Sequence, residues 1–391
     1  MQHQHHTRIF DTTLRDGEQT PGVHFSIDQK AAMARCIEAF GVDTIEAGFP
    51  ASSPGDFQAV QAVSAAVTHC EVAALARCVP GDVQAAAEAV KDAAHPVIHV
   101  VMGTSDIHLA KKTGMSRVEA VRRIEEAVSQ AARHVPEVEF SAEDATRSDP
   151  VFLRQCVYAA ITHGATRVNI ADTAGCATPT EFGRLIRDVV DFVEGRAVVS
   201  VHCHNDVGMA TANTVAAVQA GAGQVKVTSN GIGERAGNAG LEEVVRALAA
   251  KGIARTNVDV SQAVPMSEFV AAVSGVPVQP NRAVDGANAF PHSADIHQDG
   301  IIKDPANYAF VSPTLGGAAK HRFVLTARSG RSAVAHVARS RGYTLTPDQV
   351  DAVYTAVLAQ ADASAAAVSE DALAALVAEV ATEEEPVTTA G

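Results

Sequence analysis

Two histidines separated by one residue, His202 and His204, stand at the end of a β-branched segment with the sequence VSVHCHNDVG. Side chains two positions apart on a strand point to the same face, so both imidazoles face one way while Cys203 faces the helical layer. Two imidazoles on one face make half of a divalent-metal site, and Asp16 in the segment FDTTLRDGEQTPG can add a carboxylate. This donor set predicts a metal centre and leaves Mg²⁺, Mn²⁺, Zn²⁺ and Co²⁺ open.

Two further polar segments are expected beside these ligands. SAEDATRSD ends a predicted strand and places Glu143 over the same region. NGIGERAGNAGLEE follows the last predicted strand, and Asn238 within it offers a neutral oxygen. The glycines of this segment allow the backbone to approach a ligand closely. Turn geometry alone explains single glycines but not the polar residues between them, so the segment is predicted to bind a ligand.

These segments need a framework that brings them together. Eight short β-branched segments recur, each followed by a longer helical pattern; they span residues 8–12, 44–48, 71–76, 97–102, 138–142, 167–171, 198–203 and 224–228. Such alternation predicts βαβ units with parallel strands. Eight units in about 250 residues are typical of a (β/α)8 TIM barrel, whose active site lies at the C-terminal ends of its strands. A doubly wound open sheet is the alternative, but the chain shows no glycine-rich dinucleotide turn.

The pattern changes after the eighth unit. We expect a catalytic barrel over residues 1–252 and a loop-rich subdomain over 253–330, in which prolines break any long helix and which reaches over an active site. We expect a helical C-terminal subdomain over residues 331–381, in which residues 346–381 are helical in period with an interruption near 363–368, and a flexible tail over residues 382–391.

Composition excludes several classes of function. The 391 residues are 47% hydrophobic and carry a net charge of −14, which suits a globular protein and opposes binding to nucleic acid. No apolar run approaches the about 18 residues of a membrane span, and the N-terminus lacks the apolar run of a secretory signal. Six cysteines without a C-x-x-C pair favour reduced thiols in a cytoplasmic protein.

Several motifs together resemble the 2-isopropylmalate synthase and homocitrate synthase family, which are acetyl-CoA-dependent condensing enzymes on a metal-bearing barrel. The motifs are DTTLRDGEQTPG, IEAGFPASSPGDF, TSDIHLAKKTGMSR, VEFSAEDATRSDP, HCHNDVG, NGIGERAGNA and IHQDG. They cover residues 7–300 in family order and extend weakly to 331. GFPASSPGDF, TSDIH, EDATRSD and IHQDG look like 2-isopropylmalate synthase, whereas MATANTVAAVQAGA is shared with homocitrate synthases.

The resemblance implies a role for each matching residue. The metal ligands would be Asp16, His202 and His204, with Asn238 in or near the shell. Arg15 would pair with a 2-oxo acid and its developing alkoxide. The oxo-acid pocket would be lined by His99, Ser141, Thr173 and Glu143. His297 would take a proton from the acetyl-CoA methyl group, directly or through a water, with Glu143 and Tyr308 orienting or relaying it. The segment with His297 often comes from a partner subunit, so a homodimer is implied.

The expected reaction is a condensation of acetyl-CoA with 2-oxoisovalerate to give 2-isopropylmalate and CoA, as in leucine biosynthesis. A homocitrate synthase-like enzyme, or a phosphonomethylmalate- or carboxymethylmalate-type synthase, would use an acidic 2-oxo acid instead. A third hypothesis is a non-catalytic barrel kept as a binding subunit. The retained set of site residues argues against that hypothesis.

Three positions depart from the family pattern. Ser293 stands where a Glu is expected before IHQDG, and Arg328 replaces a His in LTARSGRSA. Lys226 occupies a usually acidic position in the last predicted strand. Its side chain is expected to face the barrel interior, where it would pair with Glu46 or Glu139 or meet an anionic substrate group. We expect no leucine-binding regulatory domain after residue 381 and therefore no inhibition by leucine.

Overall fold

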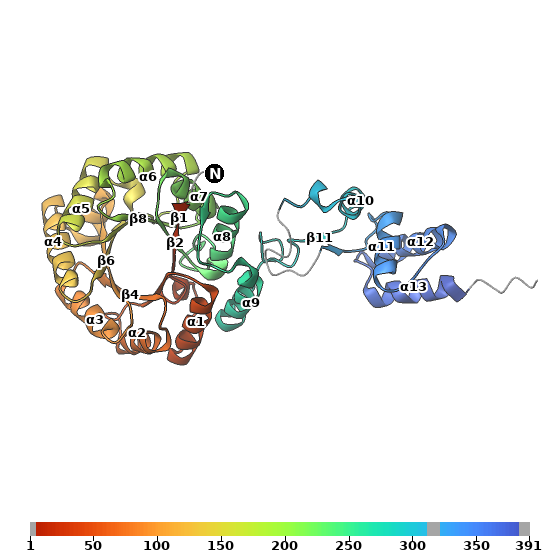
Figure 1. Cartoon of the computed structure of the whole chain (residues 1–391), viewed down its shortest axis with the longest axis horizontal. Helices are drawn as coiled ribbons and strands as arrows, with labels where there is room; N and C mark the ends of the chain where they lie inside the picture. The colour runs from red at the N-terminus through yellow and green to blue at the C-terminus, as the bar shows by residue number, and fades with distance from the viewer. Residues whose placement is uncertain (1–4, 311–320, 383–391) are drawn as a thin grey trace, which may run out of the picture. The chain divides into compact units, whose positions relative to one another are not determined.

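Eight parallel strands close into a barrel in the computed structural model, which describes residues 5–310 and 321–382. The strands are β2 (Arg8–Asp11), β3 (Thr44–Gly48), β4 (Glu71–Arg77), β5 (Pro96–Gly103), β6 (Glu137–Glu143), β7 (Arg167–Asp172), β8 (Val198–Cys203) and β9 (Gln224–Val227). Pairing of β9 with β2 closes the ring, which Figure 1 shows surrounded by helices. The predicted (β/α)8 barrel is confirmed, and an open sheet is excluded.

Eight helices alternate with these strands on the outside of the ring. They are α1 (Ile27–Phe40), α2 (Pro54–Ala66), α3 (Pro80–Val90), α4 (Arg117–Ala132), α5 (Pro150–Thr162), α6 (Pro179–Val193), α7 (Ala210–Ala220) and α8 (Leu241–Ala250). Capping boxes at Ser26 and Thr178 start α1 and α6 by satisfying backbone N–H groups that the first turn leaves free. Proline opens α2, α3, α5 and α6, where its missing N–H costs nothing.

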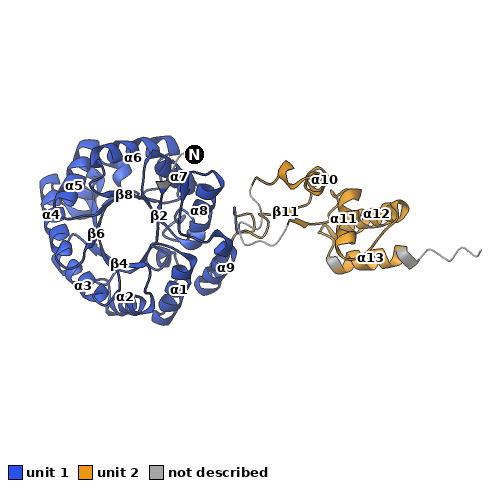
Figure 2. Cartoon of the chain, viewed as in Figure 1, with its two compact units in different colours: residues 1–278, 283–285 blue, residues 279–282, 286–391 orange. Residues whose placement is uncertain are grey.

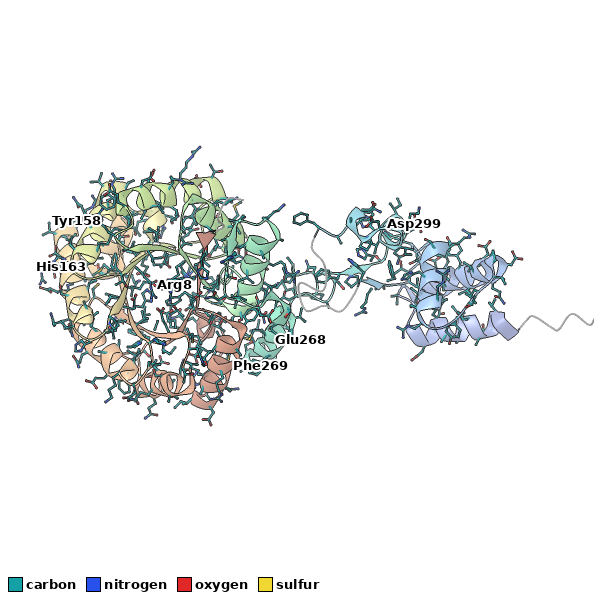
Figure 3. The ribbon with its side chains drawn as sticks, viewed as in Figure 1. Arg8, Tyr158, His163, Glu268, Phe269 and Asp299 are labelled. Atoms are coloured by element: carbon teal, nitrogen blue, oxygen red, sulfur yellow. The ribbon has the colours of Figure 1, made fainter. Side chains whose placement is uncertain are left out.

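The apolar core lies between the sheet and the helices. Strand β8 shows the alternation that builds it: Val199, Val201 and Cys203 are buried in this core, while Ser200 and His202 point into the barrel. The prediction that Cys203 packs against the helical layer is therefore confirmed. Figure 3 shows the same division at the level of side chains, with Arg8 inside the ring and Tyr158 and His163 on its outer side.

The barrel interior is mostly polar and is organised by three ion pairs, which we call the interior ion pairs. From the N-terminal to the C-terminal ends of the strands they are Glu71–Arg167 at 2.6 Å, Glu139–Lys226 at 2.7 Å and Glu46–Arg15 at 2.7 Å. Phe10, Ala73 and Val97 form a small apolar cluster among them. A buried charge is tolerated when it is paired and hydrogen-bonded, so the pairing keeps this interior stable.

The first compact unit comprises Met1–Val278 and Ala283–Asp285, and so continues past residue 252 (Figure 2). A two-residue strand, β1 (His5–His6), pairs in parallel with β10 (Ala254–Arg255), and α9 (Ala263–Ser274) packs against α1. The expectation that prolines break any long helix in this region is wrong for α9. Pro265 lies in the first turn of that helix, where no backbone N–H is needed.

The second compact unit comprises Gln279–Arg282 and the residues from Gly286 onward. It holds α10 (Asp295–Lys303), a parallel pair of β11 (Pro291–His292) and β12 (Arg322–Phe323), α11 (Arg331–Ser340), α12 (Pro347–Ser364) and α13 (Glu370–Thr382). Leu325 packs into the core of the three last helices, which joins the loop-rich and helical segments in one unit. The predicted interruption near 363–368 is confirmed, while residues 383–391 lie outside the described residues.

None of the described helices is both long enough and apolar enough to span a bilayer.

Candidate active site

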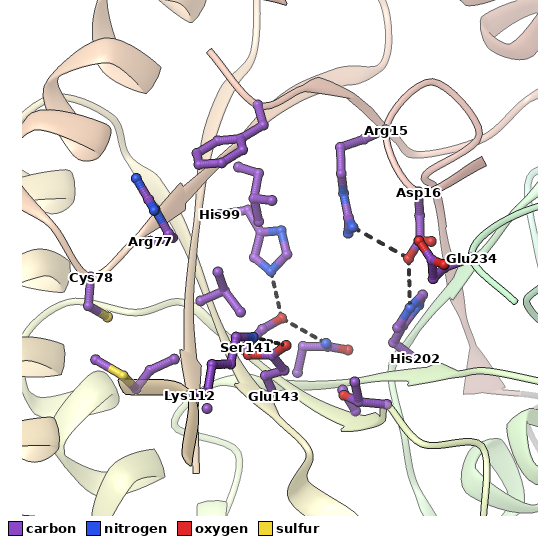
Figure 4. Close-up of a pocket in the computed structure, with 18 of the residues that line it drawn as sticks. Arg15, Asp16, Arg77, Cys78, His99, Lys112, Ser141, Glu143, His202 and Glu234 are labelled. Atoms are coloured by element: carbon purple, nitrogen blue, oxygen red, sulfur yellow. Dashed lines mark hydrogen bonds and ion pairs between the residues drawn. The ribbon is translucent and has the colours of Figure 1, made fainter. Parts of the chain in front are cut away.

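A cavity of about 520 Å³ opens at the C-terminal ends of the barrel strands (Figure 4). Eight of the residues predicted for the site line it: Arg15, Asp16, His99, Ser141, Glu143, Thr173, His202 and His204. They come from β2, β5, β6, β7 and β8 or from the loops that follow these strands. Closure of the barrel brings them together, as expected for an active site at this end of the fold.

Asp16, His202 and His204 form a compact, buried group of metal-ligand type. Asp16 Oδ2 lies 3.1 Å from His202 Nε2 and 3.8 Å from His204 Nε2, and the two Nε2 atoms are 3.1 Å apart. Burial opposes ionisation of Asp16, but the guanidinium of Arg15 and the hydrogen bond from His202 hold its pKa well below the usual range. Burial and the neighbouring His202 lower the pKa of His204 to about 3, so this imidazole is neutral and able to bind a metal.

Asn238 lies beside the same group. Its Nδ2 donates to Ile232 O at 3.1 Å, and a Cβ built at Gly233 would lie 2.2 Å from this Nδ2 and 3.2 Å from Asp16 Oδ1. Asn238 Oδ1, Asp16 Oδ1 and the Nδ1 atoms of His202 and His204 are buried without hydrogen-bond partners among the described residues. Two unpartnered oxygens, Asn238 Oδ1 and Asp16 Oδ1, beside two imidazoles whose Nε2 atoms converge on Asp16 fit a divalent cation.

Arg15 is held rigidly at the edge of this group. Its Nε donates to Glu46 Oε2 at 2.7 Å and its Nη1 approaches Asp16 Oδ2 at 3.4 Å. Thr12 Oγ1 donates to the same Glu46 oxygen at 2.6 Å. The guanidinium is therefore fixed before any ligand arrives, which is the condition for effective stabilisation of a developing negative charge.

Asp11, which sequence reasoning did not single out, anchors the loop that carries Arg15 and Asp16. Its carboxylate accepts from Thr13 N and from Thr13 Oγ1, both at 2.9 Å, and Thr13 Oγ1 accepts from Ser229 N at 2.8 Å. The first loop is thus tied to the loop after β9. Burial raises the pKa of Asp11 to about 7. An acidic residue in a strand position that faces the helices was the signal that could have revealed it.

His99 and Ser141 form one wall of the cavity. His99 Nδ1 lies 2.5 Å from Glu46 Oε1, and its Nε2 lies 2.6 Å from Ser141 Oγ. Asn169 Nδ2, another residue absent from the predicted site, donates to Ser141 Oγ at 2.8 Å. Lys226 lines the cavity floor and pairs with Glu139, one of the two partners that the sequence suggested.

Glu143 and Thr173 stand nearer the rim. Both carboxylate oxygens of Glu143 accept from Lys112 Nζ, at 2.6 and 2.8 Å, and Lys112 comes from η2 (His108–Thr113), a turn that was not predicted. Thr173 Oγ1 accepts from Asp144 N at 2.8 Å, and Thr173 O accepts from Arg235 Nη2 at 2.7 Å. The hydroxyl of Thr173 therefore holds the loop after β6 in addition to lining the cavity.

His297 and Tyr308 belong to the second unit and are brought together within it. Their rings stack with centroids 4.3 Å apart and an angle of 13° between the planes. His297 lies on α10, and Tyr308 directly follows the turn η6 (Pro305–Asn307). Of the two unusual residues, Ser293 shortly precedes α10 in the sequence, and Arg328 lies beside the start of α10 in the structure, since Asp295 N donates to Arg328 O at 2.9 Å.

Comparison with known proteins agrees with this geometry. The HMGL-like family model matches residues 6–270, and the model for the homocitrate synthase post-HMGL domain-like family matches residues 284–365. The 2-isopropylmalate synthase of Listeria monocytogenes serotype 4b is 46% identical over 369 residues, which cover 93% of this chain and 72% of that protein. The chain belongs to the 2-isopropylmalate synthase family.

Other members of this family are equally similar. The 2-isopropylmalate synthase of Nitratidesulfovibrio vulgaris is 47% identical over 95% of this chain and 74% of its own length. The probable 2-isopropylmalate synthase of Methanopyrus kandleri is 49% identical over 88% of this chain and 68% of its own length. The HMGL-like family of enzymes is metal-dependent, in keeping with the Asp16–His202–His204 group.

Solved structures share the barrel at lower sequence identity. The hydroxymethylglutaryl-CoA lyase from Pseudomonas aeruginosa aligns with a TM-score of 0.61 and 22% identity over 70% of this chain and 95% of that chain. The HMG-CoA lyase from Brucella melitensis aligns with a TM-score of 0.60 and 19% identity over 69% of this chain and 99% of that chain. These two likenesses establish the fold of this 2-isopropylmalate synthase family member and nothing finer.

Proposed function

We propose that the protein condenses acetyl-CoA with 2-oxoisovalerate to give 2-isopropylmalate and CoA, the reaction that the names of its relatives denote and a step of leucine biosynthesis. The observation that carries the proposal is the buried Asp16–His202–His204 group beside a fixed Arg15 in a cavity at the mouth of the barrel. The same residues occupy the family motifs on which the resemblance rests.

A divalent metal held by Asp16, His202 and His204, with Asn238 beside them, would supply Lewis-acid activation of the oxo-acid carbonyl. Arg15 supplies a fixed positive charge next to this position, where the alkoxide forms as C2 is attacked. His99 and Ser141 bound the space for the rest of the oxo acid.

His297 is the proposed base for the methyl group of acetyl-CoA, with Tyr308 stacked on it as the orienting residue. Loss of that proton gives the enolate, whose carbon forms the new bond to C2 of the oxo acid while the C2 carbonyl π bond opens to an alkoxide, which then takes up a proton. Water then cleaves the thioester, so that CoA leaves as the thiol and a carboxylate remains. The role of His297 as a base is taken from the family resemblance. In that family the segment that carries this histidine often comes from the partner subunit, so we also propose that the active enzyme is a homodimer.

The composition of the cavity favours an apolar oxo acid. Its walls carry several apolar side chains: Phe49, Leu75, Val79, Val101, Met102 and Met115. Its cationic side chains are already engaged, since Arg77 pairs with Asp82 and Lys112 with Glu143. An oxo acid with a second carboxylate, the substrate class of homocitrate synthase-like enzymes, would have to displace these carboxylates.

The test is release of CoA thiol with a panel of oxo acids, namely 2-oxoisovalerate, pyruvate and 2-oxoglutarate, each with metal-stripped and metal-restored enzyme. We expect the highest kcat/KM for 2-oxoisovalerate and dependence on added metal. The variant Arg15→Gln should lower kcat/KM for every oxo acid, because it removes charge from the common reaction centre. Preference for 2-oxoglutarate would contradict the substrate, and absence of turnover with all three would contradict the condensation.

A further inference from the structure

Both ring nitrogens of His99 are engaged in hydrogen bonds, one with Glu46 at 2.5 Å and the other with Ser141 at 2.6 Å. Lys226 Nζ lies 3.1 Å from Nε2 and 3.3 Å from Nδ1. A donor aligned in the ring plane with one nitrogen would be far from the other, so these similar distances place the ammonium over the ring face. The ring of Phe10 lies 4.0 Å from the same ammonium.

The hydrogen positions in this arrangement follow from the partners. The carboxylate of Glu46 can only accept, so His99 Nδ1 carries the hydrogen between them. In a neutral ring, Nε2 is then an acceptor and Ser141 must donate its hydroxyl hydrogen to it. Asn169 donates to Ser141 Oγ at 2.8 Å, which leaves this oxygen one lone pair toward the cavity. Ser141 would thus present an acceptor to the substrate.

Protonation of His99 would reverse the direction of the hydrogen bond between His99 and Ser141. Its Nε2–H would donate to Ser141 Oγ, and the hydroxyl hydrogen would be free to point into the cavity as a donor. With a neutral His99, Ser141 therefore presents a hydrogen-bond acceptor to the cavity, and with a protonated His99 it presents a donor.

Lys226 is placed to choose between these states. Its ammonium is fully buried and forms an ion pair with Glu139 Oε1 at 2.7 Å while it faces the ring. A second positive charge on the imidazole at this distance is unfavourable. Burial and the charge of Lys226 together lower the pKa of His99.

We propose that Lys226 is a positioning residue that sets the direction of the Glu46–His99–Ser141 hydrogen-bond chain and thereby makes Ser141 an acceptor toward the substrate. The consequence for substrate choice rests on the proposed function. An acceptor at this wall disfavours a second carboxylate in the oxo acid and leaves an apolar side chain unaffected.

The direction of the hydrogen-bond chain is read from the ¹⁵N chemical shifts of His99 in the histidine-labelled protein, with the signals assigned by His99→Gln. We expect one protonated and one bare nitrogen in the wild type at neutral pH, and two protonated nitrogens in Lys226→Met. Two protonated nitrogens in the wild type would overturn the proposal. Unchanged shifts in Lys226→Met would overturn it as well.

A second variant covers the case in which Lys226→Met leaves Glu139 uncompensated and the protein fails to fold. Lys226→Met/Glu139→Gln removes both charges of the pair and should still give a doubly protonated His99, because Glu46 remains in contact with the ring. Lys30→Met is the matched control. It removes another fully buried lysine, paired with Glu18 at 2.6 Å, and should leave the His99 shifts unchanged.

Kinetics of the double variant then test the effect on specificity. The ratio of kcat/KM for 2-oxoglutarate to that for 2-oxoisovalerate should rise about tenfold, the scale of one hydrogen bond to a charged group. An unchanged ratio with a doubly protonated His99 would overturn the specificity claim. Absence of turnover in the wild type would instead refute the proposed function, and the nitrogen shifts would still decide the direction of the chain.

Discussion

Asp16 contacts Arg15 on one side and both imidazoles on the other. Replacing its carboxylate therefore tests metal binding while the other side chains of the site stay in place. We expect Asp16→Asn and His202→Ala to lose bound metal while the barrel stays folded, because neither side chain belongs to the apolar core between the sheet and the helices. Turnover should fall by at least about 10²–10³-fold. The control Asp106→Asn changes an exposed carboxylate at the same end of the barrel, and metal analysis should show it unaffected. Full metal content in the two ligand variants would refute the assignment.

His297 is expected to act on the acetyl group and not on the oxo acid. His297→Ala should therefore lower kcat by about 10²–10⁴-fold with little change in the KM of the oxo acid, as for loss of a general base. Tyr308→Phe keeps the stacked ring and removes only the hydroxyl, so it distinguishes a relay from simple orientation. A near-normal kcat for His297→Ala in steady-state assays would exclude it from the mechanism.

The placement of His202 and His204 on one face was predictable from the sequence because side chains two positions apart on a strand point the same way. The contacts of Glu46, His99 and Asn169 were not predictable from the sequence, because they depend on which inward-facing residues meet across the closed barrel. Arg167 illustrates the difficulty: it bonds Glu71 from a strand that is not its neighbour. The spacing of strands along the sequence does not determine the register shift between neighbouring strands of the barrel, which decides these contacts.

The loop after β9 packs so closely on the Asp16–His202–His204 group that it has no room for a side chain at Gly233. A Cβ there would lie 2.2 Å from Asn238 Nδ2, which is impossible without displacing Asn238. Gly233→Ala should therefore weaken metal binding by roughly 10–100-fold, as expected when groups that orient ligands are disturbed. Titration with metal measures the effect. Gly81→Ala, whose Cβ would meet nothing within 4 Å, should bind metal normally; equal affinities in the two variants would contradict the packing argument.

Regular elements were predicted closely because β-branched runs and capping residues mark their ends. Strand β8 has the predicted bounds, and β5 extends the predicted segment by one residue at each end. The short turn η2 and, in the segment expected to be loop-rich, the helices α9 and α10 were missed. The turn η2 has no hydrophobic periodicity of its own. In α9, Pro265 suggested a break in the helix, although it lies in the first turn, where helices accept proline.

Asp11 couples the stability of the chain as a whole to pH. Its folded pKa is raised from 3.8 to about 7, so its contribution is fully present below pH 4 and is lost as the pH rises to 7. Relative to Asp11→Asn, the wild type should lose about 4 kcal/mol of unfolding free energy across this window, at about 1.4 kcal/mol per pKa unit. Denaturant titrations of both proteins at several pH values measure the difference. A pH-independent difference would show that Asp11 is already ionised at pH 4.

The interior ion pairs also constrain how this barrel can change during evolution. A buried charge that loses its partner is strongly destabilising, so the residues at positions 139 and 226 are not free to mutate independently. A relative with an acid at 226 needs a neutral residue at 139 or a new cation nearby. Gln224, which bonds the same carboxylate at 2.7 Å, is the position best placed to supply that cation. Across homologues, positions 139, 224 and 226 should therefore covary, and an ancestor between the two arrangements would have carried a neutral side chain at one of them.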